Sequence, residues 1–305
     1  MPVDPVRNSA VAVLLRVLES AAFLEVAVDK VLKRGRFSER SRRFLTHLVY
    51  GVVRYKLLCD WVLEPLVHQP LQDLPPPILT ILRMGAFQAL FCRQVTFPAM
   101  VHTSVELAKR WGHAGTAHLV NAVLRRAPRS LDEVQFPKAD FAGFLSVRHS
   151  MPRWLVEQWI EEQGLEEAAA LCEKLNEQAP VTLRANLLRT STDRLCAGLI
   201  RAGYPSEKRT GVPEEVTVTI GAIPLRAKLF QQGHCMLQDP ASMLPVHLLE
   251  PQPGELVLDL CAAPGGKTTH ISEKTAGKAR LLAVDVDERR LALLAQNVER
   301  LRTPN

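Results

Sequence analysis

The sequence contains no apolar stretch long enough to cross a membrane, because Arg, Lys, His or Asp interrupts every hydrophobic run in its 305 residues. An N-terminal apolar block of the secretory type is also missing. The six cysteines are scattered, and none forms a Cys-x-x-Cys pair. These absences argue against a membrane protein, a secreted disulfide scaffold and a zinc finger. They favour a cytoplasmic protein, where isolated thiols stay reduced.

Metal-ligand spacing is absent among the histidines of the first half of the chain, and we therefore expect no bound metal. Because every apolar run is interrupted, we also expect no membrane partner. These histidines are His47, His68, His102, His113 and His118.

The sequence also lacks the Gly-x-Gly-x-x-Gly spacing of dinucleotide-binding loops. It has instead a run from Leu256 to His270 in which an apolar pattern stops at a loop of very small residues. Leu256–Leu260 suits a strand inside a parallel sheet, and Lys267–Glu273 suits a helix whose positive dipole end faces the loop. Such a turn at the carboxyl end of a strand is typical of a socket for a nucleotide-like cofactor.

A phosphate-binding P-loop is an alternative for the same run, because Gly266, Lys267 and Thr268 fit the end of its Gly-x-x-x-x-Gly-Lys-Thr pattern. Cys261, however, occupies the position of the first glycine. This mismatch disfavours a P-loop NTPase and leaves a Rossmann-type site for S-adenosylmethionine (SAM) as the better interpretation.

The next predicted elements support the SAM site. Residues 279–284 are expected to form a second strand that ends in Asp285, and residues 287–302 a helix. An acid at this position can accept hydrogen bonds from ribose hydroxyls. The alternative is that Asp285 only caps the following helix. We favour the ribose role, because strand, small-residue loop, helix, strand and acid follow one another in the expected order.

The stretch Asp259-Leu-Cys-Ala-Ala-Pro-Gly-Gly-Lys267 resembles the SAM-binding motif of the RNA 5-methylcytosine methyltransferases. The nearest resemblance is to the RsmB/Sun (Fmu) family, which modifies 16S ribosomal RNA, and Gln238-Asp239-Pro-Ala-Ser242 resembles another stretch of that family. The resemblance implies SAM as cofactor and a role for Asp259 in shaping the loop or in ending the strand. It implies these cofactor-binding residues: Cys261, Ala262, Ala263, Pro264, Gly265, Gly266, Lys267 and Asp285.

The family mechanism uses a cysteine thiolate that adds to C6 of cytosine, and relatives carry it in Asp-Ala-Pro-Cys and Thr-Cys motifs. Neither motif occurs among the 305 residues, so no catalytic residue is assigned. Two strands and two helices also make only the first half of a Rossmann-type α/β domain. We therefore expect a fragment or a truncated product that binds SAM weakly and does not methylate.

The first part of the chain is expected to be an all-α bundle with a polyanion partner. Residues 1–130 contain 18 Lys and Arg against 9 Asp and Glu, although the whole chain carries only +6. The stretches 43–54, 82–90 and 121–125 resemble the NusB-type RNA-binding domain, which begins proteins of the RsmB/Sun family. Three basic clusters could meet RNA phosphates: Lys33, Arg34 and Arg36; Arg40, Arg42 and Arg43; and Arg125, Arg126 and Arg129.

The middle of the chain is expected to be a small α+β module similar to the RNA-recognition-like domain of the family. Its pattern predicts strands at 181–185 and 216–220 with a helix at 192–202 between them. Arg184 and Asn186 resemble a family strand motif, and they either face RNA or hold a domain junction together.

Three domains are thus predicted: an NusB-like all-α domain (1–130), an α+β RNA-recognition-like module (145–233) and an incomplete SAM-dependent methyltransferase domain (234–305). The favoured function is SAM-dependent methylation of cytosine C5 in 16S rRNA. The alternative is an RNA-binding NusB-like module without catalytic activity.

Overall fold

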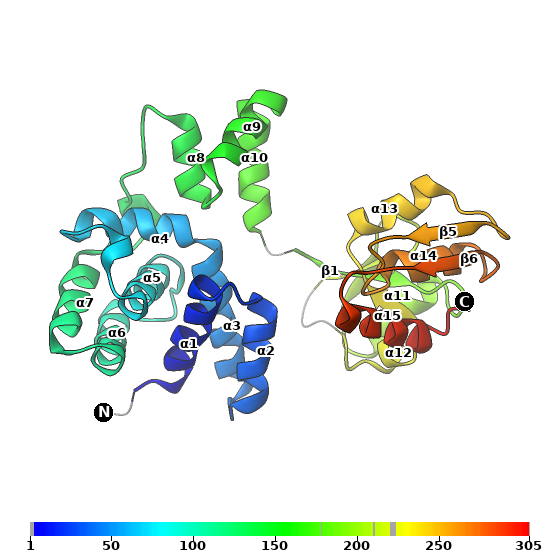
Figure 1. Cartoon of the computed structure of the whole chain (residues 1–305), viewed down its shortest axis with the longest axis horizontal. Coiled ribbons are helices and arrows are strands. Elements are labelled where there is room, and N and C mark those ends of the chain that lie inside the picture. The colour runs from blue at the N-terminus through cyan, green and yellow to red at the C-terminus, as the bar shows by residue number, and fades with distance from the viewer. Residues whose placement is uncertain (1–2, 178, 210, 220–223, 305) are drawn as a thin grey trace. The chain divides into compact units, whose positions relative to one another are not determined.

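The computed structural model describes residues 3–177, 179–209, 211–219 and 224–304. The chain divides into two compact units, Met1–Glu177 and Gln178–Asn305, each with its own core. Figure 1 shows both units, and each is described below by itself.

The first unit begins with a bundle of seven α-helices, of which α5 is the buried central one. Helix α5 is buried along almost its whole length, and it contacts α1, α3, α4, α6 and α7. Ser38 caps α3 by accepting a hydrogen bond from the Ser41 N–H, as its position in the sequence predicts. The helices are α1 (Pro5–Glu19), α2 (Leu24–Arg34), α3 (Glu39–Arg54), α4 (Lys56–Leu63), α5 (Pro76–Phe91), α6 (Phe97–Trp111) and α7 (Ala114–Arg126).

Three short 3₁₀ turns, η1 (Glu64–Leu66), η2 (Leu71–Asp73) and η3 (Leu131–Glu133), complete this bundle. The unit ends with a group of three further helices: α8 (Phe141–His149), α9 (Arg153–Gln163) and α10 (Leu165–Asn176). They bury a small core of their own, made of Leu145, Val156 and Cys172. The all-α prediction for the start of the chain is therefore confirmed.

The second unit opens with a β-α-β-β-α-β succession. It comprises β1 (Val181–Ala185), α11 (Thr192–Arg201), β2 (Ser206–Lys208), β3 (Glu215–Val218), α12 (Lys228–Gln231) and β4 (Cys235–Leu237). The strands form one antiparallel sheet in the order β2-β3-β1-β4, which is the ferredoxin-like arrangement. The predicted strands and the helix between them are present, with the second predicted strand at Glu215–Val218, whereas residues 145–177 of the predicted module belong to the first unit. Ile220, the predicted strand end, lies outside the described residues.

The remainder of the second unit contains α13 (Pro240–Leu249), β5 (Leu256–Asp259), α14 (Gly266–Lys274), β6 (Arg280–Ala283) and α15 (Glu288–Leu301). Strands β5 and β6 pair in parallel, with Leu256 opposite Arg280 and Asp259 opposite Ala283. The predicted strand, loop, helix, strand and helix are therefore present, within one or two residues at each end.

One face of this parallel pair, together with part of α13, carries apolar side chains that stay exposed. Leu258 is 53% and Leu282 57% exposed, although side chains of this type are usually buried in a parallel sheet. The exposed apolar set comprises Leu244, Leu248, Leu249, Leu256, Leu258, Leu260, Leu282, Val284 and Val286. Within the described ranges, no helix is both long and apolar enough to pass through a bilayer.

Candidate functional site

The candidate cofactor loop, residues 260–265, joins the carboxyl end of β5 to the N-terminus of α14. Asp259 fixes both ends of this loop. Its Oδ1 accepts a hydrogen bond from the Cys261 N–H at 3.3 Å, and its Oδ2 accepts one from the Thr268 hydroxyl at 2.7 Å. Asp259 therefore shapes the loop through its own side chain.

Asp285 reaches the same loop from the end of β6. Its Oδ2 accepts a hydrogen bond from the Ala263 N–H at 3.0 Å, and its Oδ1 accepts one from the Asp287 N–H at 3.1 Å. The backbone hydrogen bonds from Asp287 and Ala263 lower the pKa of Asp285, which keeps it a carboxylate at neutral pH. The residue that caps α15 is Asp287, whose Oδ1 accepts from the N–H groups of Arg289 and Arg290, so the capping role considered for Asp285 belongs to its neighbour.

Most backbone donors of the loop are already used inside the protein. The N–H groups of Cys261, Ala262, Ala263 and Gly265 donate to Asp259, Val284, Asp285 and Ala262. Within the part of the chain that the structure describes, no acceptor is found for the N–H groups of Gly266, Lys267 and Thr268. These three form the first turn of α14, where a helix carries its positive dipole end. The donors that remain free for an anionic ligand therefore belong to the helix rather than to the loop.

Two side chains of helix α15 hold the loop by hydrogen bonds to its carbonyl groups. The Arg290 guanidinium donates to the Ala263 carbonyl at 2.8 Å, and the Asn297 amide donates to the Pro264 carbonyl at 3.0 Å. Gly265 adopts the left-handed conformation at φ +101°, and a Cβ there would lie 3.2 Å from the Leu294 side chain. A glycine is therefore needed at this position both for the backbone conformation and for the packing of α15.

The predicted cofactor residues differ in accessibility. Cys261, Pro264 and Lys267 are exposed and Gly266 is half-buried, whereas Ala262, Ala263 and Gly265 are buried. The structure brings all of them and Asp285 to one edge of the β5–β6 pair. Ligand contact is open to the exposed members, and the buried members shape the turn.

Behind the loop lies Arg184 of β1, whose side chain is 0% exposed. Its guanidinium pairs with both oxygens of Glu273, at 2.7 and 3.1 Å, and it also donates to the Thr269 hydroxyl and the Gln238 amide oxygen. A further hydrogen bond goes to the backbone carbonyl of Gly266. Arg184 thus ties the ferredoxin-like sheet to the first residue of α14.

Asn186 makes a second connection within this unit. Its amide donates to the carbonyls of Gly233 and Leu301 at 3.0 and 2.8 Å, and the side chain is fully buried. Of the two roles that the sequence allows for Arg184 and Asn186, the structure therefore supports the junction and not an RNA-facing surface.

Of the six cysteines, four are buried, Cys196 is partly exposed and Cys261 is exposed. Burial raises the pKa of the Cys92 thiol to about 11 and that of Cys235 to about 12, and it raises the pKa of Cys59 well above its usual range. Such thiols carry almost no thiolate at neutral pH and are poor nucleophiles. Cys261 is the exposed cysteine, and it belongs to the candidate cofactor loop.

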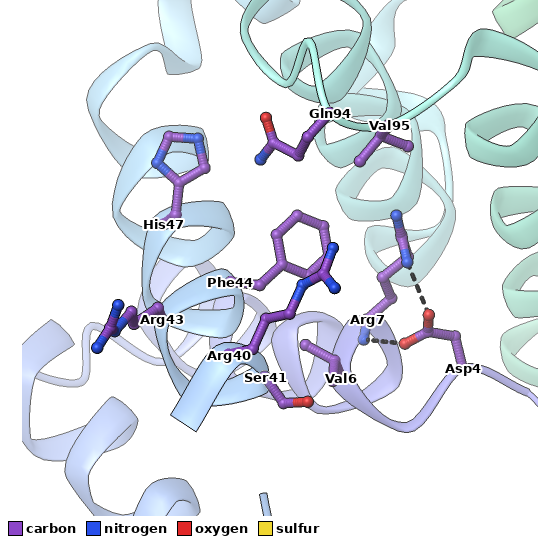
Figure 2. Close-up of a pocket in the computed structure, with 10 residues that line it drawn as sticks. All are labelled: Asp4, Val6, Arg7, Arg40, Ser41, Arg43, Phe44, His47, Gln94 and Val95. Carbon is purple, nitrogen blue, oxygen red and sulfur yellow. Dashed lines mark hydrogen bonds and ion pairs between the residues drawn. The ribbon is translucent and has the colours of Figure 1, made fainter. Parts of the chain in front are cut away.

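A basic pocket of about 460 Å³ lies on the first unit between α1, α3 and the turn after α5. Figure 2 shows Arg40 and Phe44 within it, with Gln94 and Val95 on another wall. The Arg7 guanidinium lies 4.9 Å from the centre of the Phe44 ring. The pocket is lined by Asp4, Val6, Arg7, Arg40, Ser41, Arg43, Phe44, His47, Gln94 and Val95.

The structure separates the members of the predicted basic clusters. Arg40 and Arg43 line the pocket, but Arg42 donates to the Leu32 carbonyl at 2.9 Å and so helps to hold α2 against α3. Arg125 and Arg129 line a second pocket of about 400 Å³ beside α6 and α7. Lys33 is paired with Asp29 at 2.6 Å on the surface.

Sequence reasoning missed a group of polar residues in the second unit, two of them buried and one partly exposed. Glu214, His247 and His270 converge although they are far apart along the chain. The only hint in the sequence was the polar character of α14, where Thr268, Thr269 and Ser272 are also buried. A polar helix pattern usually indicates a solvent-exposed helix, so the sequence pattern of α14 favours exposure where the structure shows burial.

Three protein-family models match successive parts of the chain. A model described as the NusB family matches residues 4–129. A model described as the Methyltr_RsmF/B-like, ferredoxin-like domain matches residues 151–221. A third, described as 16S rRNA methyltransferase RsmB/F, matches residues 246–305.

Similar proteins extend over nearly the whole chain. A probable ribosomal RNA small subunit methyltransferase B of Bacillus subtilis is 32% identical over 300 residues, which cover 97% of this chain and 66% of the relative. The ribosomal RNA small subunit methyltransferase B of Cronobacter sakazakii is 32% identical over 304 residues, which cover 97% and 67%. The chain thus spans about two thirds of the length of these curated relatives.

The fold also matches a solved structure, titled "Crystal Structure of PH0851", with a TM-score of 0.75 and 24% identity. The match covers 99% of this chain and 68% of that one. It supports the same succession of folds.

Proposed function

Because the chain belongs to the family of ribosomal RNA small subunit methyltransferases B, we propose that it acts in the SAM-dependent methylation of cytosine C5 in 16S ribosomal RNA. The proposal also carries over the predicted division of labour. An NusB-like domain (1–130) and an α+β module (145–233) bind RNA, and residues 234–305 bind the methyl donor. We also propose that the protein acts in the cytoplasm.

The first turn of α14 supports SAM as the cofactor. Three N–H groups without an acceptor, at Gly266, Lys267 and Thr268, suit the carboxylate of a methionine moiety, and the Lys267 ammonium adds a positive charge. The Asp285 side chain is 4% exposed and lies 3.9 Å from Nη1 of Arg290, but each of its carboxylate oxygens keeps a lone pair after the backbone hydrogen bonds and so suits a ribose hydroxyl. The residues present therefore fit the two polar ends of SAM.

When bound, SAM supplies an electrophilic methyl group. Cytosine C5 becomes nucleophilic enough to accept it only after a thiolate has added to C6, and a base must then remove the C5 proton before the thiolate leaves. Buried thiols such as Cys59, Cys92 and Cys235 do not suit this role. In this proposal Cys261 lines the SAM-binding site and is not the nucleophile. We therefore expect the 305-residue polypeptide to bind SAM without methylating RNA on its own.

The exposed apolar face of the β5–β6 pair fits a larger methyltransferase sheet. Parallel strands are normally covered on both faces, and the curated relatives are longer than this chain. Under the proposal, further strands and helices of the Rossmann-type domain cover the side chains of Leu258, Leu282 and their neighbours.

RNA contact is proposed for the pocket that contains Arg40 and Arg43. Their guanidinium groups are exposed and can pair with two phosphates, while the ring of Phe44 offers an apolar surface to a sugar or base. The basic excess of the first 130 residues would then guide the polyanion towards this unit.

The experiment that tests the cofactor assignment compares SAM affinity in three proteins by isothermal titration calorimetry. Asp285→Asn removes the charge that faces the ribose, and the loss of charge-assisted hydrogen bonds should weaken SAM roughly 10- to 100-fold. Glu288→Gln, an exposed change on the first turn of α15, is the matched control and should leave the affinity unchanged.

Equal SAM affinity in Asp285→Asn and wild type would contradict the ribose assignment, provided that both proteins unfold at the same temperature. Binding of 16S rRNA without any measurable SAM binding would instead support the alternative, an RNA-binding module with no catalytic role.

A further inference from the structure

Three potential metal ligands from three separate elements meet in the second unit. Glu214 precedes β3, His247 lies on α13 and His270 lies on α14. The side chains of Glu214 and His270 are 1% and 0% exposed, and that of His247 is 24% exposed. Their ligand atoms all lie within 4.8 Å of one another.

The distances match those of a coordination shell. Ligand atoms about 2.1 Å from a tetrahedral Zn²⁺ lie about 3.4 Å from one another. Here Nε2 of His247 is 2.9 Å from Oε2 of Glu214, and Nε2 of His270 is 3.7 Å from Oε1 of Glu214. The two measured pairs, each to a different oxygen of Glu214, therefore lie on either side of the expected separation.

His270 gives an independent reason to look for a ligand. Both of its ring nitrogens are buried, and neither lies within hydrogen-bond distance of a partner among the described residues; the Nε2 atom is 3.7 Å from Oε1 of Glu214. An imidazole always carries at least one N–H donor, and a buried polar group without a partner destabilises the folded protein. A metal ion bound to Nε2 would use the lone pair of that nitrogen and remove one of the two unpaired groups.

We propose that Glu214, His247 and His270 bind one divalent transition-metal ion of the Zn²⁺ class, with the fourth position open to water. Two imidazoles and one carboxylate are a ligand set that this ion uses in proteins. On binding, His247 coordinates as a neutral imidazole through Nε2: a proton leaves Nε2 and one is taken up at Nδ1, and the metal replaces the hydrogen bond to Glu214. The proposal differs from the expectation of no metal that the sequence gives.

Lys274 is the competing group at this site. Its Nζ lies 3.4 Å from Oε1 of Glu214, and its side chain is one-third exposed. The ammonium can swing into solvent when an ion binds the carboxylate. In the absence of metal it partly neutralises Glu214, so its removal should favour the metal.

The position of the site suggests a structural role. The ion would link the ferredoxin-like sheet, through Glu214, to helices α13 and α14. His270 lies one turn after Lys267, so the same ion would anchor the helix whose first turn faces the candidate cofactor loop. The inference rests on the ligand geometry and not on the proposed methylation.

The test uses the full, untagged 305-residue chain and Co²⁺ as a spectroscopic probe for the Zn²⁺ site. We expect one Co²⁺ per chain, with the visible absorption of a four-coordinate ion, and its displacement by Zn²⁺. His247→Gln should lower the affinity for Co²⁺ at least 100-fold, whereas His118→Gln, at an exposed histidine of α7, should leave it unchanged. The absence of a stoichiometric visible band at micromolar protein, or equal affinity in His247→Gln and wild type, would overturn the proposal.

A second variant guards against loss of folding at the buried positions. Lys274→Met changes a partly exposed side chain and should raise the Co²⁺ affinity several-fold, because the competing ammonium is gone. If the three residues form only an ion-paired polar cluster, Lys274→Met will lower the unfolding temperature without any gain in metal affinity, and the proposal is then wrong.

Discussion

Replacing Arg184 by Met should sharply destabilise the second unit. The side chains of Arg184 and Glu273 are 0% and 2% exposed, so the substitution leaves a carboxylate buried without its cation. Breaking a buried pair from one side costs about 3–5 kcal/mol. The Gly266 carbonyl and the Thr269 hydroxyl also lose a partner, so we expect a loss towards the upper end of this range.

The assay must report on the right part of the chain. All four tryptophans, at 61, 111, 154 and 159, belong to the first unit, so tryptophan fluorescence would miss the transition. Cys235 is fully buried in the core of the second unit, and its labelling rate in urea reports the opening of that unit. Arg209→Met is the matched control, because the Arg209–Glu207 pair is about half exposed and contributes little.

The double variant Arg184→Met with Glu273→Met completes the cycle. Since both charges are removed together, it should recover most of the stability that the single change loses. A cost below about 1 kcal/mol for Arg184→Met, or a double variant less stable than both single variants, would refute the argument that an unpaired buried charge is responsible.

Three further predictions concern the loop, the basic pocket and the thiols. Gly265→Ala should destabilise the second unit by about 1 kcal/mol or more, because Gly265 has a positive φ. Gly266→Ala should cost less, because its new methyl group would make only ordinary van der Waals contacts. The rate of Cys235 labelling in urea distinguishes the two variants. Arg40→Gln with Arg43→Gln should reduce the salt dependence of RNA binding by about 1–2 in the slope of log K against log[salt], and an unchanged slope would assign both side chains to solvent. Iodoacetamide at pH 8 should modify Cys261 first in the folded protein, because burial raises the pKa of the core thiols; peptide mapping that finds a core cysteine labelled earlier would contradict this.

The parts of the fold that the sequence predicts are those encoded locally. The strand Leu256–Asp259, its small-residue loop and helix α14 follow one another within 20 residues, and apolar periodicity with small residues is enough to find them. The ferredoxin-like strands were also found, except for β2 and β4, which have only three residues each and too little pattern to detect.

Side-chain roles that depend on distant residues could not be predicted. Arg184 meets Glu273 across 89 positions, and its charge alone is compatible with RNA contact. His247 and His270 face Glu214 only because α13 and α14 pack together in the second unit. In the basic cluster of α3, the use of Arg42 within the fold depends on the approach of α2, which spacing along the chain does not reveal.

The saturation of the loop's own backbone donors has a kinetic consequence. A turn whose N–H groups are already engaged keeps its shape whether or not anything occupies the socket, so little conformational entropy is lost when a small molecule arrives. Association should then follow a single exponential whose rate rises linearly with ligand concentration, without the plateau that a slow rearrangement would impose.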